Sequence, residues 1–421
     1  MSVISLKYGR DAIDLEFDRD RFEVLEDRVR DGSLSDAEIG ERLDSPIDAR
    51  PLEEIVEPGE TVLIVVPDAT RSTGSGQIVN LLVRRLIANG TAPHEIAIIF
   101  ATGIHRKVTD SEKTEIVTPF IAQRIKMLDH DPRDLASVVR LGETSMGIPV
   151  ELNRAVADYD HVIIVGGVTF HYFAGFTGGR KLICPGLASS RTISATHKLA
   201  FDCETFSRRE GVDTGVLDGN AVHDAFMECV RQAPPSFAIT SVMDRDGTIG
   251  DLFCGDWITS HRAACDAFAE GHTIRIAEQR DLVVASCGGY PHDVSMIQAH
   301  KTLDAASRAC KPGGAIVLLA ACEDGLGRSD FRDWFDATDA KSLAERLCEK
   351  YQVNGQTAWN LLRIAETFDV RTVTELDDAT TSSMRLGRIS TIDVANIIKN
   401  ENARGYILPA GAKFKIRLGD Q

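Results

Sequence analysis

The chain has 421 residues, of which 47 are lysine or arginine and 63 are aspartate or glutamate, so its formal net charge is −16 at neutral pH. This acidic excess repels nucleic-acid phosphates and anionic membrane surfaces, so any anionic ligand would have to be bound by a local positive site. Hydrophobic residues at 43% and charged residues at 26% exclude a disordered or fibrous chain, and the length predicts about two or three domains.

No stretch of the sequence predicts a membrane span. The longest apolar runs, such as 62–66 and 315–322, are far shorter than the roughly 18 residues that cross a bilayer. The N-terminal residues alternate apolar and polar side chains, unlike a signal peptide. Because the nine cysteines are scattered and form no C-x-x-C pair, we expect a cytoplasmic protein with reduced thiols.

The N-terminal part of the sequence predicts a hairpin followed by βα units. The continuous apolar run that ends before Pro67 and Asp68 is typical of a parallel strand buried on both faces. The predicted elements are, in order, strands at 3–6 and 13–17, acidic helix-like sequence to about residue 58, a strand at 61–66, a helix at 76–88, and strands at 96–100 and 161–165.

Three of these strands run into polar segments that contain Asp68, His105 and His171. Ligands of an open parallel α/β sheet bind beyond the carboxyl ends of its strands. We therefore expect the three segments to contribute to one site.

A second series of βα elements follows residues 261–279, which read as helix or linker. It predicts a strand at 281–286, a helix at 296–309, a strand at 315–321 and a strand-like segment at 406–418. Because the strand–helix pattern begins again here, we expect a domain boundary near residue 275. The sequence thus predicts an α/β protein with two domains and mainly parallel sheets.

Two short motifs place charged or titratable residues after strands. Asp68, Thr70 and Arg71 lie in a loop at a helix start, where an arginine suits a carboxylate or phosphate, although a helix cap with a surface arginine explains the pattern equally well. His105 follows the next strand, where it could carry a proton or serve only as a loop residue.

The densest motif is H-Y-F-A-G-F-T-G-G-R-K at 171–181. Gly178, Gly179 and Arg180 resemble a phosphate-binding loop, but Leu182 stands where a P-loop has Ser or Thr to hold magnesium, which argues against a P-loop NTPase. His171 and His197 are 26 residues apart, so spacing alone gives only weak support for a metal site.

Gln298 and Lys301 stand at i and i+3 of the predicted helix at 296–309, which places them on one helix face. Such a face can bind an acidic substrate, or it can simply be solvated.

Taken together in this order, these motifs resemble the nickel-pincer nucleotide-dependent lactate racemase family. The resemblance covers most of the chain and implies Rossmann-like sheets with an active site in the cleft between the domains. It implies a cofactor-binding catalytic domain at 1–274, to which residues 405–421 return, and an α/β domain at 275–404 that closes over the substrate.

The resemblance also implies a cofactor and its ligands. The family's nickel-pincer nucleotide is a pyridinium mononucleotide whose thioamide and thiocarboxylate arms bind nickel. Lys181 would tether it covalently, and His197 would be the protein ligand to the metal. The residues that would surround the rest of the nucleotide are Asp68, Thr70, Gly178, Gly179 and Arg180.

By the same resemblance, His105 and His171 would be the acid/base pair of a 2-hydroxy acid racemase or epimerase, in which hydride moves to the cofactor and back through a 2-keto acid. Arg71, Gln298 and Lys301 would bind the substrate, and cofactor-biosynthesis enzymes would be transient partners. Ile297 stands where lactate-specific members carry tyrosine, so the resemblance leaves lactate, malate or another 2-hydroxy acid open.

Two other functions fit parts of this pattern. A non-catalytic protein that binds a 2-hydroxy acid would keep the fold and the carboxylate ligands. A nicotinamide-dependent dehydrogenase would use the βα units, but the sequence lacks a complete G-x-G-x-x-G with its downstream acidic residue.

Overall fold

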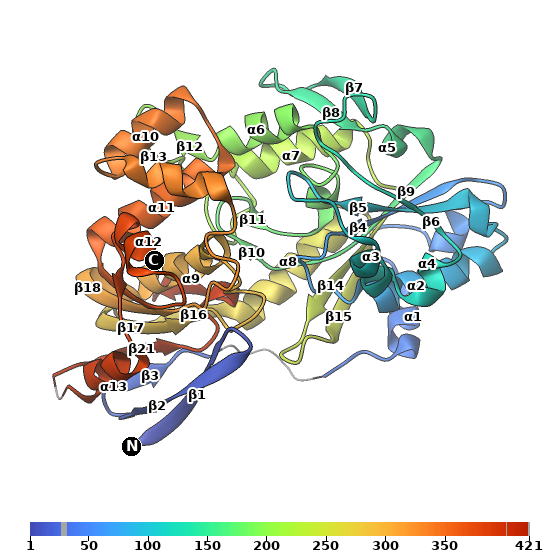
Figure 1. Ribbon diagram of the computed structural model, residues 1–421. Coiled ribbons are helices and arrows are strands. Elements are labelled where there is room, and N and C mark those ends of the chain that lie inside the picture. The colour runs from blue at the N-terminus through green and yellow to red at the C-terminus, as the bar shows by residue number, and fades with distance from the viewer. Residues whose placement is uncertain (27–31, 401, 420–421) are drawn as a thin grey trace. The chain divides into compact units, whose positions relative to one another are not determined.

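Two units, each built around a six-stranded sheet, make up the chain in the computed structural model (Figure 1). The structure describes residues 1–26, 32–400 and 402–419. Unit 1 contains Met1–Arg28, Phe201–Arg208 and His272–Gln421, and unit 2 contains Val29–Ala200 and Arg209–Gly271. The predicted α/β class with two mainly parallel sheets is confirmed.

The sheet of unit 2 has the strand order β15-β14-β9-β4-β5-β6, and all neighbouring strands in it are parallel except β14 and β15. The elements of unit 2 are α1 (Asp36–Asp44), η1 (Leu52–Glu54), β4 (Val62–Pro67), α2 (Ser75–Ala88), η2 (Pro93–Glu95), β5 (Ile96–Ala101), α3 (Asp110–Val117), α4 (Pro119–Ala122), β6 (Lys126–Leu128), β7 (Val138–Glu143), β8 (Pro149–Asn153), α5 (Ala155–Asp158), β9 (His161–Gly167), β10 (Phe170–His171), β11 (Gly175–Phe176), η3 (Gly179–Leu182), α6 (Ser190–Lys198), α7 (Ala221–Arg231), β14 (Phe237–Met243), β15 (Ile249–Gly255) and α8 (Thr259–His272).

Strand β4 illustrates how the sequence produces this sheet. All six of its residues are buried, and its side chains alternate between two cores: Leu63 and Val65 enter one, while Ile64 enters the other. Successive side chains of a strand point to opposite faces, so a continuous apolar run suits a strand that is covered on both sides. The prediction of a buried parallel strand here is confirmed.

The order of strands brings the polar segments of unit 2 together. Strand β4 lies between β9 and β5 and is parallel to both. The segments that follow these strands, which begin at Asp68, Thr102 and Val168, therefore leave the sheet at the same edge.

The sheet of unit 1 has the strand order β20-β19-β18-β17-β21-β3 and is parallel throughout. The elements of unit 1 are β1 (Ser2–Tyr8), β2 (Asp11–Phe17), β3 (Phe22–Val24), β12 (Phe201–Asp202), β13 (Ser207–Arg208), β16 (Thr273–Ile276), β17 (Arg280–Ser286), α9 (Met296–Ala309), β18 (Cys310–Leu319), η4 (Ser329–Asp336), α10 (Ala340–Glu349), α11 (Val353–Thr367), β19 (Asp369–Val373), α12 (Asp378–Ser383), β20 (Gly387–Arg388), α13 (Thr391–Lys399), β21 (Gly405–Leu408), η5 (Gly411–Lys413) and β22 (Lys415–Leu418).

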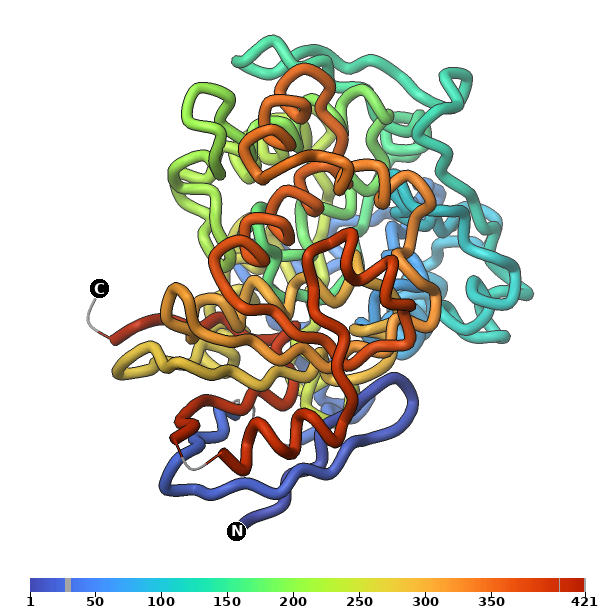
Figure 2. Tube along the Cα trace, turned by 60° about the vertical axis from the view of Figure 1, so that its left-hand side comes forward, coloured from blue at the N-terminus to red at the C-terminus, as the bar shows by residue number. Residues whose placement is uncertain are grey.

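The two ends of the chain both belong to unit 1, which differs from the prediction. Residues 405–421 were expected to return to the N-terminal domain, but β21 pairs with β17 and β3, and β22 pairs with β16. The predicted N-terminal hairpin forms as β1 and β2, and it lies beside α13 (Figure 2). The assignment of these terminal strands to unit 1 depends on pairing between residues far apart in the sequence, which local sequence patterns do not encode.

The acidic stretch before residue 58 is only partly helical. It contains α1, but β3 forms where helix was expected, because this segment pairs with β21 at the edge of the unit 1 sheet. Residues 27–31 of the stretch lie outside the described residues.

One segment of unit 1, Phe201–Arg208, interrupts unit 2 in the sequence, and we name it the crossing segment. Within unit 1 it forms the β12–β13 pair, and the Phe201 ring lies edge-on to Trp359 with 4.9 Å between centroids. Cys203 of this segment forms a disulfide with Cys348, 145 residues away in sequence. The expectation of reduced thiols throughout is therefore wrong for this pair, since spacing along a chain does not reveal a contact made by folding.

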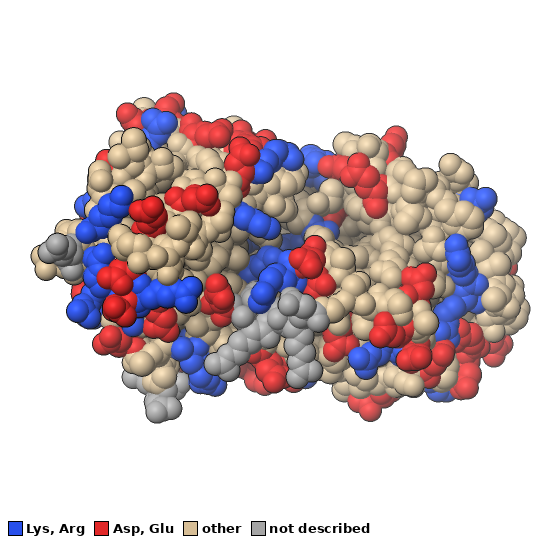
Figure 3. Space-filling view, turned by 90° about the horizontal axis from the view of Figure 1, so that it is seen from below, with Lys and Arg blue, Asp and Glu red and all other residues tan. Residues whose placement is uncertain are grey.

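None of the helices in the described part of the chain combines the length and apolar character that a membrane crossing needs. On the face in Figure 3, Asp and Glu side chains are mixed with Lys and Arg.

Candidate active site

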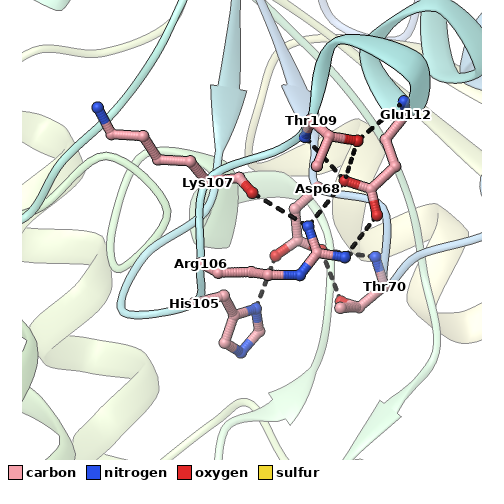
Figure 4. A network of polar contacts seen from close by, with 7 residues as sticks. All are labelled: Asp68, Thr70, His105, Arg106, Lys107, Thr109 and Glu112. Carbon is pink, nitrogen blue, oxygen red and sulfur yellow. Dashed lines mark hydrogen bonds and ion pairs between the residues drawn. The ribbon is translucent and has the colours of Figure 1, made fainter.

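The first part of the site is a pair formed by Asp68 and His105. Asp68 directly follows β4, and His105 lies in the loop after β5. Nδ1 of His105 lies 2.6 Å from Oδ2 of Asp68, and the His105 ring is turned toward that carboxylate (Figure 4). Thr70 donates its backbone N–H and its hydroxyl to the other carboxylate oxygen, at 3.0 and 2.6 Å. One oxygen of Asp68 is thereby bound by Thr70 of its own loop, and the other by His105 of the loop after β5.

The electrostatics keep Asp68 ionised. Burial alone would raise its pKa, but the hydrogen bond and charge of His105, together with Arg71 and Thr70, lower the pKa to about 2. A carboxylate accepts hydrogen bonds only, so Nδ1 of His105 carries a proton, and in the neutral ring the lone pair is on Nε2. The His105 side chain is 46% exposed, whereas Asp68 is 7% exposed. The pair can therefore present a proton-accepting Nε2 to a ligand.

The residue after His105 fixes the loop to helix α3. Arg106 donates to both carboxylate oxygens of Glu112, which also accepts the backbone N–H of Thr109 in a capping box at the start of the helix (Figure 4). The hydrogen bond from Arg106 is the main cause that lowers the pKa of Glu112 to about 2. This network limits the freedom of the loop that carries His105.

His171 has the opposite hydrogen-bonding state. It ends β10, and its Nδ1 accepts the backbone N–H of Ala174 at 3.2 Å. An accepting Nδ1 cannot carry a proton, so the neutral ring has its proton on Nε2. In their neutral forms, His105 thus has an accepting Nε2 and His171 a donating Nε2–H, a difference that the sequence motifs do not reveal.

His197 lies in the last turn of α6 and is buried. Its Nδ1 donates to the carbonyl oxygen of Ile193 at 2.8 Å, which leaves the lone pair on Nε2. Burial, reinforced by the positive charge of Lys181, lowers the pKa of His197 to about 3. A neutral imidazole with one nitrogen fixed by a carbonyl is the form that binds metals.

Lys181 and His197 share two aromatic neighbours. The Lys181 ammonium lies 5.8 Å from the Phe173 ring centroid and 5.6 Å from that of Phe226. The His197 ring lies 5.2 and 5.5 Å from the same two rings. The predicted tether and the predicted metal ligand are therefore brought together around one aromatic pair.

Among the described residues, no group of three or more His, Cys, Asp or Glu side chains could hold a metal ion. A metal bound by His197 would thus need most of its donors from a cofactor. A single neutral imidazole beside a lysine fits a nickel ion that is already held by the soft sulfur groups of a tethered nucleotide.

The glycine-rich loop before Lys181 is closely packed. A Cβ at Gly178 would lie 2.8 Å from the Gly167 carbonyl oxygen, and one at Gly179 would lie 2.5 Å from the His261 ring. Both glycines also have positive φ, at 73° and 50°. Their place in the loop is explained by packing and backbone conformation, while their contact with a cofactor phosphate stays a prediction.

Arg180 lies inside this loop. It is buried, and its guanidinium donates to the carbonyl oxygens of Ala174 and Phe176 at 2.7 and 3.1 Å. Burial is the main cause that lowers its pKa to about 10. These bonds hold the chain between His171 and Lys181, so Arg180 organises the loop whether or not it also meets a cofactor.

Gln298 and Lys301 belong to unit 1, whereas the other predicted site residues belong to unit 2. They lie together on α9 as their spacing predicts, since Nζ of Lys301 donates to Oε1 of Gln298 at 2.7 Å. Their role in substrate binding stays a prediction.

Sequence reasoning missed Phe226 and the link between Asp68 and His105. Phe226 stands in α7 outside every motif, so no sequence signal marks it. The Asp68 link could have been inferred from the placement of both residues just beyond adjacent parallel strands.

Known proteins match this chain over nearly its whole length. The lactate racemase N-terminal domain matches residues 8–207, and the lactate racemase C-terminal domain matches residues 276–414. The chain is 32% identical to a lactate racemase from Lactiplantibacillus plantarum over 352 residues, which cover 82% of this chain and 81% of that protein. It is 28% identical to a lactate racemase from Thermoanaerobacterium thermosaccharolyticum over 434 residues, which cover 99% and 100%.

Solved structures show the same relationship. The lactate racemase apoprotein from Thermoanaerobacterium thermosaccharolyticum matches with a TM-score of 0.89 and 26% identity, covering 99% of this chain and all of that one. A protein from Thermotoga maritima, with a TM-score of 0.73 and 17% identity over 94% of this chain and all of that one, shares the fold. The chain belongs to the lactate racemase family.

Proposed function

We propose that this protein is a racemase or epimerase of a 2-hydroxy acid that uses a tethered nickel-pincer nucleotide. The observation that carries the proposal is the complementary state of its two histidines. The His105 ring has an accepting Nε2 because Asp68 binds its Nδ1–H, and the His171 ring has a donating Nε2–H because its Nδ1 accepts a backbone N–H. A reaction that removes a proton from a hydroxyl and returns one needs both states.

The chain's own groups would act as follows. His105 accepts the hydroxyl proton at Nε2, and Asp68 stabilises the imidazolium that results. The keto acid turns, and the Nε2–H of His171 returns a proton to its oxygen from the other side. His105 then releases its extra proton to solvent and His171 takes one back from solvent, which restores both rings for the next turnover; in the reverse direction a deprotonated His171 accepts the proton and a protonated His105 donates it. Arg71 would hold the substrate carboxylate, with Gln298 and Lys301 as further ligands.

The cofactor, when bound, supplies a ring carbon that accepts the substrate's hydride and returns it. Lys181 would hold it covalently, and His197 would bind its nickel through Nε2. Enzymes that synthesise the cofactor would be transient partners, and the site of action would be cytoplasmic.

The experiment is to produce the protein together with the cofactor-biosynthesis enzymes and to follow enantiopure 2-hydroxy acids by chiral chromatography. We expect racemisation or epimerisation of at least one acid, and its loss in His105→Ala and His171→Ala. His94→Ala is the matched control, because His94 is exposed in η2 outside the site.

Three outcomes would contradict the proposal. Stoichiometric binding of an acid without any change at its C2 carbon indicates a binding protein. A requirement for added nicotinamide nucleotide indicates a dehydrogenase. Full activity of Lys181→Ala excludes the tether.

A further inference from the structure

Two phenylalanines from distant parts of unit 2 converge on the tether lysine. Phe173 follows β10, and Phe226 lies in the middle of α7. They are 2% and 0% exposed. The Lys181 ammonium lies within 6 Å of both ring centroids, which is the range in which a ring attracts a cation. The lysine therefore lies next to two aromatic rings.

A buried polar side chain fixes the relative position of the two rings. Asn220 caps α7 by accepting the backbone N–H groups of Val222 and His223. Its Nδ2 group donates to the carbonyl oxygen of Phe173 at 3.0 Å. Because Asn220 is buried and bonded to both elements, it locks the helix that carries Phe226 to the segment that carries Phe173.

The same rings also contact the predicted metal ligand. The His197 ring is tilted or edge-on to both phenylalanines, with interplanar angles of 69° to Phe173 and 57° to Phe226. A flexible four-carbon lysine side chain has many conformations. Rings that attract its charged end and also contact His197 favour the conformations that bring Nζ close to that histidine.

We propose that Phe226, together with Phe173, is a positioning residue that holds the Lys181 ammonium beside His197 until the cofactor is attached. This inference rests on the proposed function, because it explains how the tether and the metal ligand meet at one cofactor. Acylation removes the positive charge of a lysine: the ammonium first gives one proton to solvent, the amine nitrogen then forms a bond to the acyl carbon, and the leaving group of that carbon departs with its electron pair. The aromatic pair then flanks an uncharged tether, so its attraction acts before attachment.

The first test uses the protein without cofactor. Its lysines are converted to dimethyllysines with ¹³C-formaldehyde, which keeps the charge, and the methyl signal of Lys181 is identified with Lys181→Arg. We expect this signal to be displaced upfield by the two rings in the wild-type protein and to move toward the position of exposed dimethyllysines in Phe226→Leu. The same substitution at Phe237, a buried phenylalanine of β14 in a different core, is the matched control and leaves the signal in place.

The second test measures attachment. Each variant is produced with the cofactor-biosynthesis enzymes, and the fraction of adduct is followed over time by intact mass. We expect attachment to slow roughly three- to tenfold in Phe226→Leu and to stay unchanged in Phe237→Leu. Trifluorophenylalanine at position 226 keeps the ring shape but weakens its attraction for a cation, so it tests the same point if the leucine variant is unstable; we expect an intermediate rate.

The two tests distinguish a failure of this inference from a failure of the proposed function. A Lys181 methyl signal and an attachment rate that are unchanged in both Phe226 variants overturn the inference, even if the wild-type protein is fully loaded. A wild-type protein that takes up no cofactor contradicts the proposed function, while the signal of the cofactor-free protein still decides whether the aromatic pair holds the lysine.

Discussion

Two buried aspartates, one in each unit, have different partners. Asp68 in unit 2 pairs with His105, whose side chain is 46% exposed. Asp304 in unit 1 is bound by Arg208, Arg308 and Asn360, and the two arginine side chains are 18% and 28% exposed. Burial alone would raise the pKa of each carboxyl group, but in both cases these partners lower it.

The partner decides what the carboxylate does. Arginine keeps its charge at any working pH, so Asp304 is a permanent crosslink between the crossing segment, α9 and α11. An imidazole nitrogen can both accept and release a proton, so Asp68 orients a group that can take part in proton transfer. A buried carboxylate is therefore a weak sign of catalysis by itself, and the accessibility and chemistry of its partner are the stronger sign.

The largest effect should come from Asp68→Asn. The amide has nearly the same shape but no charge to stabilise a protonated His105, so we expect kcat for the 2-hydroxy acid to fall about 10²- to 10⁴-fold. The free energy of unfolding should change by less than about 2 kcal/mol. Rate measurements and urea unfolding of the same preparations test both halves of this expectation.

The adduct fraction serves as the control for Asp68→Asn. If the variant loses cofactor in parallel with activity, Asp68 acts through cofactor binding and the pair with His105 is not the cause. If Asp68→Asn has the kcat of the wild-type protein, the Asp68–His105 pair has no role in catalysis.

Asp304→Asn should show the reverse pattern. The substitution leaves Arg208 and Arg308 without their buried counter-charge, so we expect the free energy of unfolding to fall by about 3 to 5 kcal/mol. Asp369→Asn is the control, because Asp369 forms an exposed ion pair with Arg371 that should contribute less than about 1 kcal/mol. Equal urea midpoints for the two variants would show that the Asp304 cluster is no crosslink.

The disulfide of the crossing segment should contribute less. Cys203 and Cys348 close a loop of 145 residues, and restricting the unfolded chain in this way typically stabilises by about 2 to 4 kcal/mol. We expect a reducing agent to lower the melting temperature of the wild-type protein and to have no effect on the Cys203→Ser/Cys348→Ser double variant. Alkylation of the denatured, unreduced protein should label seven thiols; nine labelled thiols would show that the bond is absent.

The regular elements were predictable because their signals are local. The apolar run of β4 and the helical period of α9 are each complete within a few residues, and α9 spans the predicted residues. The assignment of β3 and β21 to one sheet was not predictable, because it depends on a pairing between residues almost 400 positions apart.

The same distinction applies to the site. The motifs identified His105 and His171, but their opposite proton positions depend on Asp68 and on the N–H of Ala174, which only the fold reveals. Phe226 was missed for the same reason, since its partners Lys181 and His197 come from other segments of the chain.

The smallest predicted effect is the pH dependence that Asp68 contributes. Its pKa is about 2 in the folded protein against an ordinary value of 3.8, so the ionised carboxylate stabilises the fold above about pH 4, and this contribution is lost as the pH falls toward 2. The full shift corresponds to about 2 kcal/mol. Because water reaches His105, screening should reduce this to about 1 kcal/mol.

The difference in unfolding free energy between wild type and Asp68→Asn, measured by urea titration from pH 6 to pH 3, should therefore shrink as the solution becomes more acidic. A constant difference would mean that Asp68 stabilises the loop through its hydrogen bonds with Thr70 rather than through its charge, which would weaken the contrast with Asp304.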